Sequence, residues 1–205
     1  DNTIKSQRCC ILNVLCCSHW QMLLSYSRLV TICDASDVVT AGAPGDNTHL
    51  VRALHEGAPE LRTLAGIRDP ALVEALWEAP VGATREVIVG GKLDPEIGEP
   101  WSVAAKLERK QEVRGLKRQV VLAIGALRLV VTEGPALIMK PSFYKDVGLD
   151  PLAADVVVVK NLFPFLLFFL PYNRKTLFVR TKGRTDLDAA DRLAFAGPMH
   201  PRDSV

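Results

Sequence analysis

The sequence predicts an α/β fold built on a mixed sheet, and three observations lead to this class. Short apolar runs alternate with helical patterns up to about residue 80,. The section from about residue 83 to 133 changes to β-rich runs that are separated by Gly, Pro or charged turns,. A continuous apolar run at 156–159 is typical of a central strand covered on both faces,. We therefore expect a mixed sheet with a β-rich antiparallel insertion, for which α+β is the alternative description.

The first elements alternate between strand and helix. Residues 29–33 predict a short buried strand, and a glycine-rich loop follows it. Apolar residues at helical spacing between positions 50 and 54 predict a helix that stops at Gly57,. A second strand is expected at 61–67. The next helix has Asp69 as its N-cap and a proline in its first turn,.

Mostly antiparallel strands are expected in the insertion. Four runs carry this expectation: TREVIVGGK, WSVAAKLER, RQVVLAI and ALRLVVTE,. Beyond it, 141–151 predicts a short helix with a turn, 155–160 a central strand and 176–183 one more strand,. The tail is expected to be a loop.

The nearly continuous apolar run at 161–171, NLFPFLLFFLP, is too short for a membrane span. A span needs about 20 apolar residues. Here Lys160 precedes the run, and Pro164 and Pro171 interrupt it,. We expect buried core in this place, with a surface for a partner as the alternative, and no membrane as a partner.

The composition indicates a protein with a substantial core and gives no sign of nucleic-acid binding. The chain has 205 residues and is 48% hydrophobic, so it can bury a substantial core,. It carries 25 basic and 23 acidic residues, a net charge of +2, and basic residues do not form a stripe interleaved with aromatics. Nucleic acid is therefore not an expected partner.

The cysteines all lie near the start of the chain: Cys9, Cys10, Cys16, Cys17 and Cys33. Zinc sites usually space paired ligands as C-x2-C, whereas two adjacent Cys-Cys pairs rarely reach one ion. We expect reduced thiols, as suits a cytoplasmic protein, and no metal site in this chain. Residues 1–30 are expected to be a leader only loosely tied to the fold, and 31–205 to form the domain.

The loop and helix start at 41–50, AGAPGDNTHL, have two interpretations. In the first, the backbone N–H groups of Gly45 to Thr48 bind a small anion at the positive end of the helix dipole. Asp46 and Asn47 belong to the same loop, and Lys160, at the end of a central strand, adds a cation if the fold brings it near,.

The second interpretation of this loop is a capped turn. Asp46 is then the N-cap of the helix, accepting from the N–H of Thr48 or His49, and Gly42 and Gly45 provide the turn geometry,. The loop lacks the G-x4-G-K-[ST] and G-x-G-x-x-G patterns of phosphate-binding loops,. We expect the cap to dominate, with any ligand contact secondary. For Lys160 the second interpretation is that the aliphatic part of its side chain lies along apolar surface and its ammonium group reaches water at the end of the strand.

A family resemblance adds to these expectations. Several segments occur in the order found in the carboxy-terminal domain of the microcystin-degradation (MlrC-type) family: DASDVVTAGAPGDNTHLVRAL, IRDPALVEAL, GATREVIVGGKLDP, VVTE, FYKDVGLDP and VVVVK. The match resembles this domain from about residue 32 to the end, and GAPGDNTHL is its most specific element.

The resemblance implies a metallopeptidase-like hydrolase family whose zinc ligands and hydrolytic site lie in a preceding amino-terminal domain. For this chain it implies an accessory domain that shapes the cleft of that separate catalytic domain, which is its expected partner. No catalytic or metal-binding residue is then expected here, and zinc belongs to the partner domain. His49 and His55 agree with this, because they are six residues apart and lie on different sides of a helix,.

The chain departs from the family pattern in two places. Members usually carry Asn-Pro-Gly-Gly at 38–41, where this chain has Val-Val-Thr-Ala. Many also have His-Phe-Arg after the central strand, where 164–166 here is Pro-Phe-Leu, while Lys160 is retained. The alternatives to an accessory domain are a stand-alone module that binds a small anion and an inactive truncated gene product.

Overall fold

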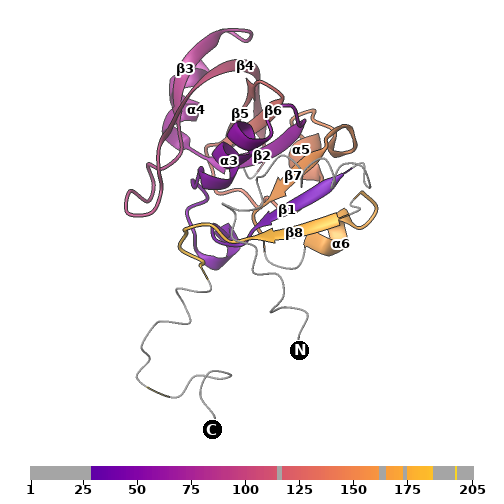
Figure 1. The fold of residues 1–205 in the computed structure, drawn as a ribbon. Coiled ribbons are helices and arrows are strands. Elements are labelled where there is room, and N and C mark those ends of the chain that lie inside the picture. The colour runs from indigo at the N-terminus through magenta and orange to yellow at the C-terminus, as the bar shows by residue number, and fades with distance from the viewer. Residues whose placement is uncertain (1–28, 115–116, 162–164, 173–174, 187–196, 198–205) are drawn as a thin grey trace.

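The structure, a computed structural model, describes residues 29–114, 117–161, 165–172, 175–186 and 197. Figure 1 shows the described part of the chain arranged around one mixed sheet of eight strands. From one edge of the sheet to the other, the strands are β3 (Thr84–Val89), β4 (Trp101–Val113), β5 (Lys117–Ile124), β6 (Leu127–Thr132), β2 (Thr63–Arg68), β7 (Val156–Val159), β1 (Val30–Asp34) and β8 (Lys175–Val179). Residues 1–28, and with them most of the expected leader and four of its cysteines, lie outside the described residues.

One half of the sheet is parallel. It contains four strands besides β6: β1 (Val30–Asp34), β2 (Thr63–Arg68), β7 (Val156–Val159) and β8 (Lys175–Val179). Strand β7 pairs with both β1 and β2, and all four of its valines are buried. The expected central strand is confirmed, because β-branched side chains pack well on both faces of a covered sheet.

The other half is the antiparallel insertion. Its strands are β3 (Thr84–Val89), β4 (Trp101–Val113), β5 (Lys117–Ile124) and β6 (Leu127–Thr132), each paired with the next along the chain. Strand β6 also pairs in parallel with β2, so it joins the two halves. The mixed sheet with a β-rich antiparallel section is therefore confirmed.

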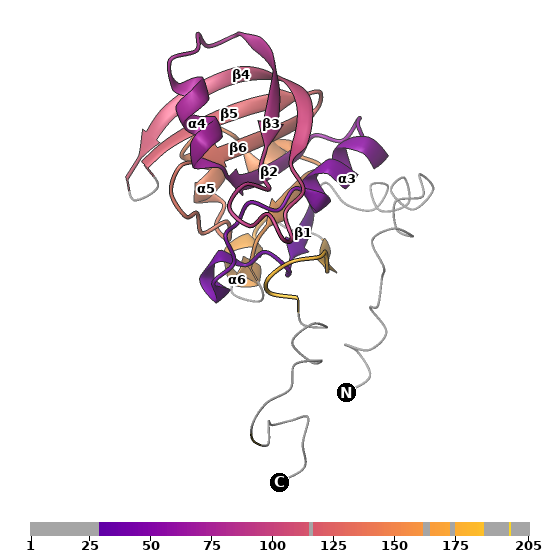
Figure 2. The same cartoon turned by 90° about the vertical axis from the view of Figure 1, so that its left-hand side faces the viewer.

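Helices α3 (His49–Gly57) and α4 (Pro70–Trp77) pack against one face of the sheet. In α3, Leu50, Val51 and Leu54 are buried as the helical spacing predicts,. Figure 2 shows α4 lying across the antiparallel strands.

The expected N-cap of α4 is confirmed. Asp69 accepts a hydrogen bond of 3.0 Å from the backbone N–H of Leu72, and Pro70 occupies the first helical position, where its missing N–H costs nothing,. The second carboxylate oxygen of Asp69 accepts from Lys92 Nζ at 2.7 Å and from the N–H of Gly90 at 2.9 Å. The cap therefore also ties α4 to the loop after β3.

Short elements cover the opposite face: α5 (Ser142–Lys145) and α6 (Phe165–Phe169). Two 3-10 turns, η2 (Val39–Ala41) and η3 (Pro151–Ala153), lie in the connections. The apolar run of α6 divides between core and surface, because Phe165 and Phe169 are fully buried while Leu167 and Leu170 are 78% and 76% exposed. Within the described ranges, no helix has the length and apolarity needed to cross a membrane.

Candidate functional site

The neighbouring strands β1 and β7 form a topological switch point. After β1 the chain continues to α3 on one face of the sheet, and after β7 it continues to α6 on the other face. In open α/β sheets, ligands bind in the crevice outside the carboxyl ends of two such strands. The candidate site is therefore the edge of the sheet at which strands β1 and β7 end, which we call the carboxyl edge.

A buried ion pair fills the switch point. Lys160, which follows β7, places Nζ 2.5 Å from Oδ2 of Asp37, which follows β1. Both side chains are almost completely buried, and Lys160 Nζ also donates to the carbonyl oxygens of Gly45 and Asn47, each at 3.3 Å. The three donors of the ammonium group thus have three acceptors within the protein.

The carboxylate of Asp37 binds the backbone of the glycine-rich loop. Its Oδ1 accepts from the N–H of Gly45 and its Oδ2 from the N–H of Asn47, both at 2.9 Å. Burial raises the pKa of Asp37, but the charge of Lys160 and the hydrogen bonds from Lys160, Asn47 and Gly45 outweigh it, so the pKa lies below its ordinary value,. Asp37 is therefore a carboxylate at neutral pH.

The structure brings the predicted site residues together around this pair: Gly45, Asp46, Asn47, Thr48 and Lys160. Two of the backbone donors expected for an anion, those of Gly45 and Asn47, already bind Asp37. Lys160 neither faces an open crevice nor extends to water, since the residue is 2% exposed. Ligand binding by these five residues stays a prediction.

Sequence reasoning missed Asp37. Its signal was its place, because it comes three residues after β1 ends, at the carboxyl edge where polar side chains of α/β folds gather,. The expectation for the glycines is confirmed: Gly42 and Gly45 have φ of 95° and 83°, values in the left-handed region that side chains with a Cβ rarely adopt,.

The expectation that Asp46 caps α3 is wrong. The helix begins at His49 with Thr48 as N-cap, and the N–H of His49 donates to the side chain of Asn47 at 2.9 Å. Asp46 lies too far before the first turn, and its Oδ2 accepts from the N–H of Leu93 at 2.7 Å. Its carbonyl accepts from the N–H of Gly91 at 3.0 Å. Asp46 therefore joins two loops.

A third segment, residues 181–186, lies against both loops, and we call it the strap. Asn47 Nδ2 donates to the carbonyl of Lys182. Arg184 donates to Asp94 at 2.6 and 2.9 Å and to Glu96 at 2.6 Å. The carboxyl edge is thus made of three loops that hold one another by polar contacts.

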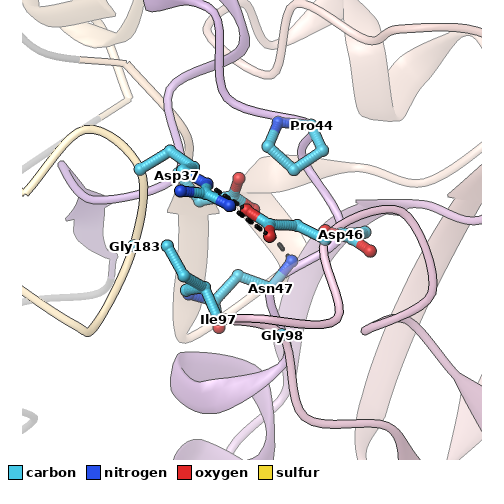
Figure 3. A pocket seen from close by; sticks show the side chains of 9 residues that line it. Asp37, Pro44, Asp46, Asn47, Ile97, Gly98 and Gly183 are labelled. Carbon is cyan, nitrogen blue, oxygen red and sulfur yellow. Dashed lines mark hydrogen bonds and ion pairs between the residues drawn. The ribbon is translucent and has the colours of Figure 1, made fainter.

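A small hollow remains among these loops, and Figure 3 shows Asp37, Asp46 and Asn47 lining it. The other lining residues are Pro44, Asp94, Ile97, Gly98, Gly183 and Arg184. Its volume is about 10 Å³, which is room for about one water molecule,. In this conformation the hollow cannot take a peptide.

Comparison with known proteins shows the family to which the chain belongs. The family model described as MlrC C-terminus matches residues 32–194. The chain belongs to this family. Microcystinase C of Sphingomonas sp. is 27% identical over 185 residues, which cover 86% of this chain and 36% of that protein. A crystal structure of a candidate metallopeptidase from Mesorhizobium sp. BNC1 shares the fold, with a TM-score of 0.78 and 24% identity over 96% of this chain and 41% of that one.

The MlrC C-terminus family therefore covers most of the chain, and the resemblance found in the sequence is confirmed. The chain spans about a third of the length of Microcystinase C, which implies a separate further domain in that relative. The most specific segment of the resemblance, 42–50, contains the loop whose backbone binds Asp37 and Lys160.

The rings of the two described histidines of this MlrC C-terminus domain contact Glu99 and Trp101. His49 Nδ1 is 4.0 Å from a carboxylate oxygen of Glu99, and the ring of His55 lies 5.4 Å from the ring of Trp101. Within the described ranges, no group of three or more His, Cys, Asp or Glu side chains is arranged to hold a metal ion. Cys33 is buried, and its thiol donates to the backbone carbonyl oxygen of Asn161.

Proposed function

We propose that this chain is the C-terminal accessory domain of a zinc-dependent peptidase or amide hydrolase of the cytoplasm. It shapes the cleft of a catalytic domain that carries the zinc ligands and the hydrolytic groups. The proposal rests on membership of the MlrC C-terminus family and on the 36% of Microcystinase C that the chain spans.

The observation that carries the proposal is the closed switch point. An α/β domain that binds its own substrate usually leaves this crevice open. Here Lys160 and Asp37 fill it, and their polar atoms bond to each other and to the loop. The ion pair makes the carboxyl edge a fixed surface, which suits a domain that positions loops beside another domain's active site.

The exposed face of α6 supports a partner domain. Four large apolar side chains of α6 and of the residue that follows it are exposed: Leu166, Leu167, Phe168 and Leu170. Lys140 places Nζ 4.8 Å from the ring centre of Phe168, so a cation borders the apolar patch. A partner surface that is apolar at its centre and acidic at its rim complements this face.

The geometry gives less support to the alternative of a module that binds a small anion. Such a site needs free N–H donors and a free cation, whereas Gly45, Asn47 and Lys160 all donate to groups within the protein. An anion would have to displace the carboxylate of Asp37 to reach them.

Two measurements on the purified chain test the proposal. Elemental analysis determines the zinc content, and a hydrolysis assay uses a cyclic peptide as substrate, with Microcystinase C as the positive control. We expect neither stoichiometric zinc nor turnover from this chain alone. Stoichiometric zinc together with turnover would show a complete hydrolase and would overturn the accessory role.

A further inference from the structure

A second carboxylate, that of Asp34, is buried beside the ion pair with one oxygen unpaired. Oδ1 accepts from the N–H of Ser36 at 3.1 Å and from Thr181 Oγ1 at 3.2 Å. Oδ2 is buried and has no hydrogen-bond partner among the described residues, and Asp34 as a whole is 1% exposed. A buried ionised oxygen without a donor is far more costly than a neutral one.

The charges at this edge do not balance if both aspartates are ionised. The charge of Lys160 acts on Asp34, but the ammonium group of Lys160 donates directly to Asp37 at 2.5 Å. Asp37 also has two backbone donors, so it is the better stabilised of the two carboxylates. Ionising Asp34 as well would leave a net negative charge in a buried cluster.

We propose that Asp34 is a neutral carboxylic acid in the folded protein. When Asp34 ionises, the strap, residues 181–186, is released from the turn after β1. The neutral acid keeps its carbonyl oxygen as the acceptor for Ser36 and Thr181. The ionised form needs water at Oδ2, and the strap is hydrogen-bonded to the turn that contains Asp34.

Several hydrogen bonds join the strap to the turn after β1. The N–H of Thr181 donates to Ser36 Oγ at 2.8 Å, and the N–H of Thr185 donates to the carbonyl of Ser36 at 3.1 Å. Thr185 Oγ1 donates to the carbonyl of Ala35 at 3.0 Å. A shift of the turn to hydrate Asp34 therefore breaks contacts at both ends of the strap.

The electrostatic surroundings of Asp34 agree with the geometry. Burial is the largest influence and raises its pKa, the charge of Asp37 raises it further, and Lys160 and the hydrogen bonds from Ser36 and Thr181 oppose this without reversing it,. The other titratable neighbour on its strand is Cys33, whose pKa burial raises to about 12, so the thiol stays neutral.

The sign of the pH effect follows from linkage. An acid whose pKa is raised in the folded state stabilises the fold while it is protonated, and this stabilisation is lost as pH rises above the ordinary value of 3.8 toward the folded pKa,. One proton released on opening lowers the protection of the strap by up to about tenfold per pH unit. Asp34→Asn mimics the neutral acid and removes this dependence.

Hydrogen exchange followed from about pH 5 to about pH 8 tests the proposal on the full chain. We expect the protection factors of the strap amides to fall with rising pH in the wild type and to stay flat in Asp34→Asn. Asp37→Asn is the comparison variant: it removes the charge that raises the pKa of Asp34 and leaves Lys160 to favour the carboxylate form of Asp34. The pH dependence of strap protection should therefore be weaker in Asp37→Asn than in the wild type. Equal pH profiles for wild type and Asp34→Asn would overturn the proposal.

A measurement on the wild type alone keeps the test decisive if a variant fails to fold. Carbon-13 NMR of the Asp34 carboxyl group reports its protonation state directly. We expect the chemical shift of a neutral acid at neutral pH, together with a carboxylate shift for Asp37. A carboxylate shift for Asp34 at neutral pH would contradict the proposal.

Discussion

Lys160 and Asp37, which are 123 positions apart in the sequence, place Nζ and Oδ2 2.5 Å apart in the buried centre of the carboxyl edge. The contact joins the segment after β7 to the segment after β1 and fixes the loop at 43–48 from below. It is also the reason that the switch point of the sheet is closed rather than open to a ligand.

The first prediction concerns the strength of this pair. Removing one partner leaves an uncompensated buried charge, so Lys160→Met should lower the free energy of unfolding by about 3 to 5 kcal/mol, and Asp37→Asn by a similar amount. The double variant should lose clearly less than the sum of the two. Chemical denaturation of the four proteins measures this cycle, and additive losses would show that the two groups do not interact.

Acid should weaken the fold through Asp37. Because its folded pKa lies below 3.8, the carboxylate contributes stability that is present above pH 3.8 and is lost as pH falls through the folded pKa,. Unfolding by urea at a series of acidic pH values should therefore show a shallower acid limb for Asp37→Asn than for the wild type. Parallel acid limbs would mean that Asp37 titrates normally in the folded protein.

Asp46 offers a test of the structure against the capping interpretation. If its carboxylate binds the N–H of Leu93, a serine side chain is too short to replace it, and Asp46→Ser should be as damaging as Asp46→Ala, by about 1 to 3 kcal/mol,. Asp46→Asn keeps an acceptor at the same reach and should cost less. A helix N-cap would give a different order, with serine nearly as good as aspartate.

The strap should be sensitive at Gly183. A Cβ at this position would lie 2.0 Å from the carbonyl oxygen of Ser36, which is backbone and cannot swing away. Gly183→Ala should therefore raise the rate of limited proteolysis within the strap. Gly197→Ala is the control, because no atom of the described residues lies within 4 Å of its added Cβ. Equal cleavage of the two variants would mean that the strap does not pack on the turn.

The elements of this fold could be predicted from the sequence because their signals are local. The four valines of β7 predict a covered central strand, and Asp69 followed by Pro70 predicts the start of α4, and both are confirmed. Strand order has no local signal. That β7 lies between β1 and β2 depends on the crossover connections, and only the structure shows it.

The candidate site was predictable only in part for the same reason. The segment from Gly45 to Thr48 stood out by its composition, and Lys160 by its place after a central strand. The sequence does not single out Asp37, because its partner lies 123 positions away. Asp46 was misread as a cap because sequence spacing cannot show that the loop around Leu93 comes within 2.7 Å of it.

The central claim, that this fold serves a catalytic domain, is tested most directly by exchanging domains in Microcystinase C. Three proteins are compared in one hydrolysis assay: the full-length relative, the relative without the region that this chain matches, and the relative with that region replaced by this chain. We predict that truncation lowers turnover, that the exchange restores part of it, and that the exchange carrying Lys160→Met restores less. A truncated relative as active as the full-length protein, or an exchanged protein no more active than the truncated one, would contradict the accessory role.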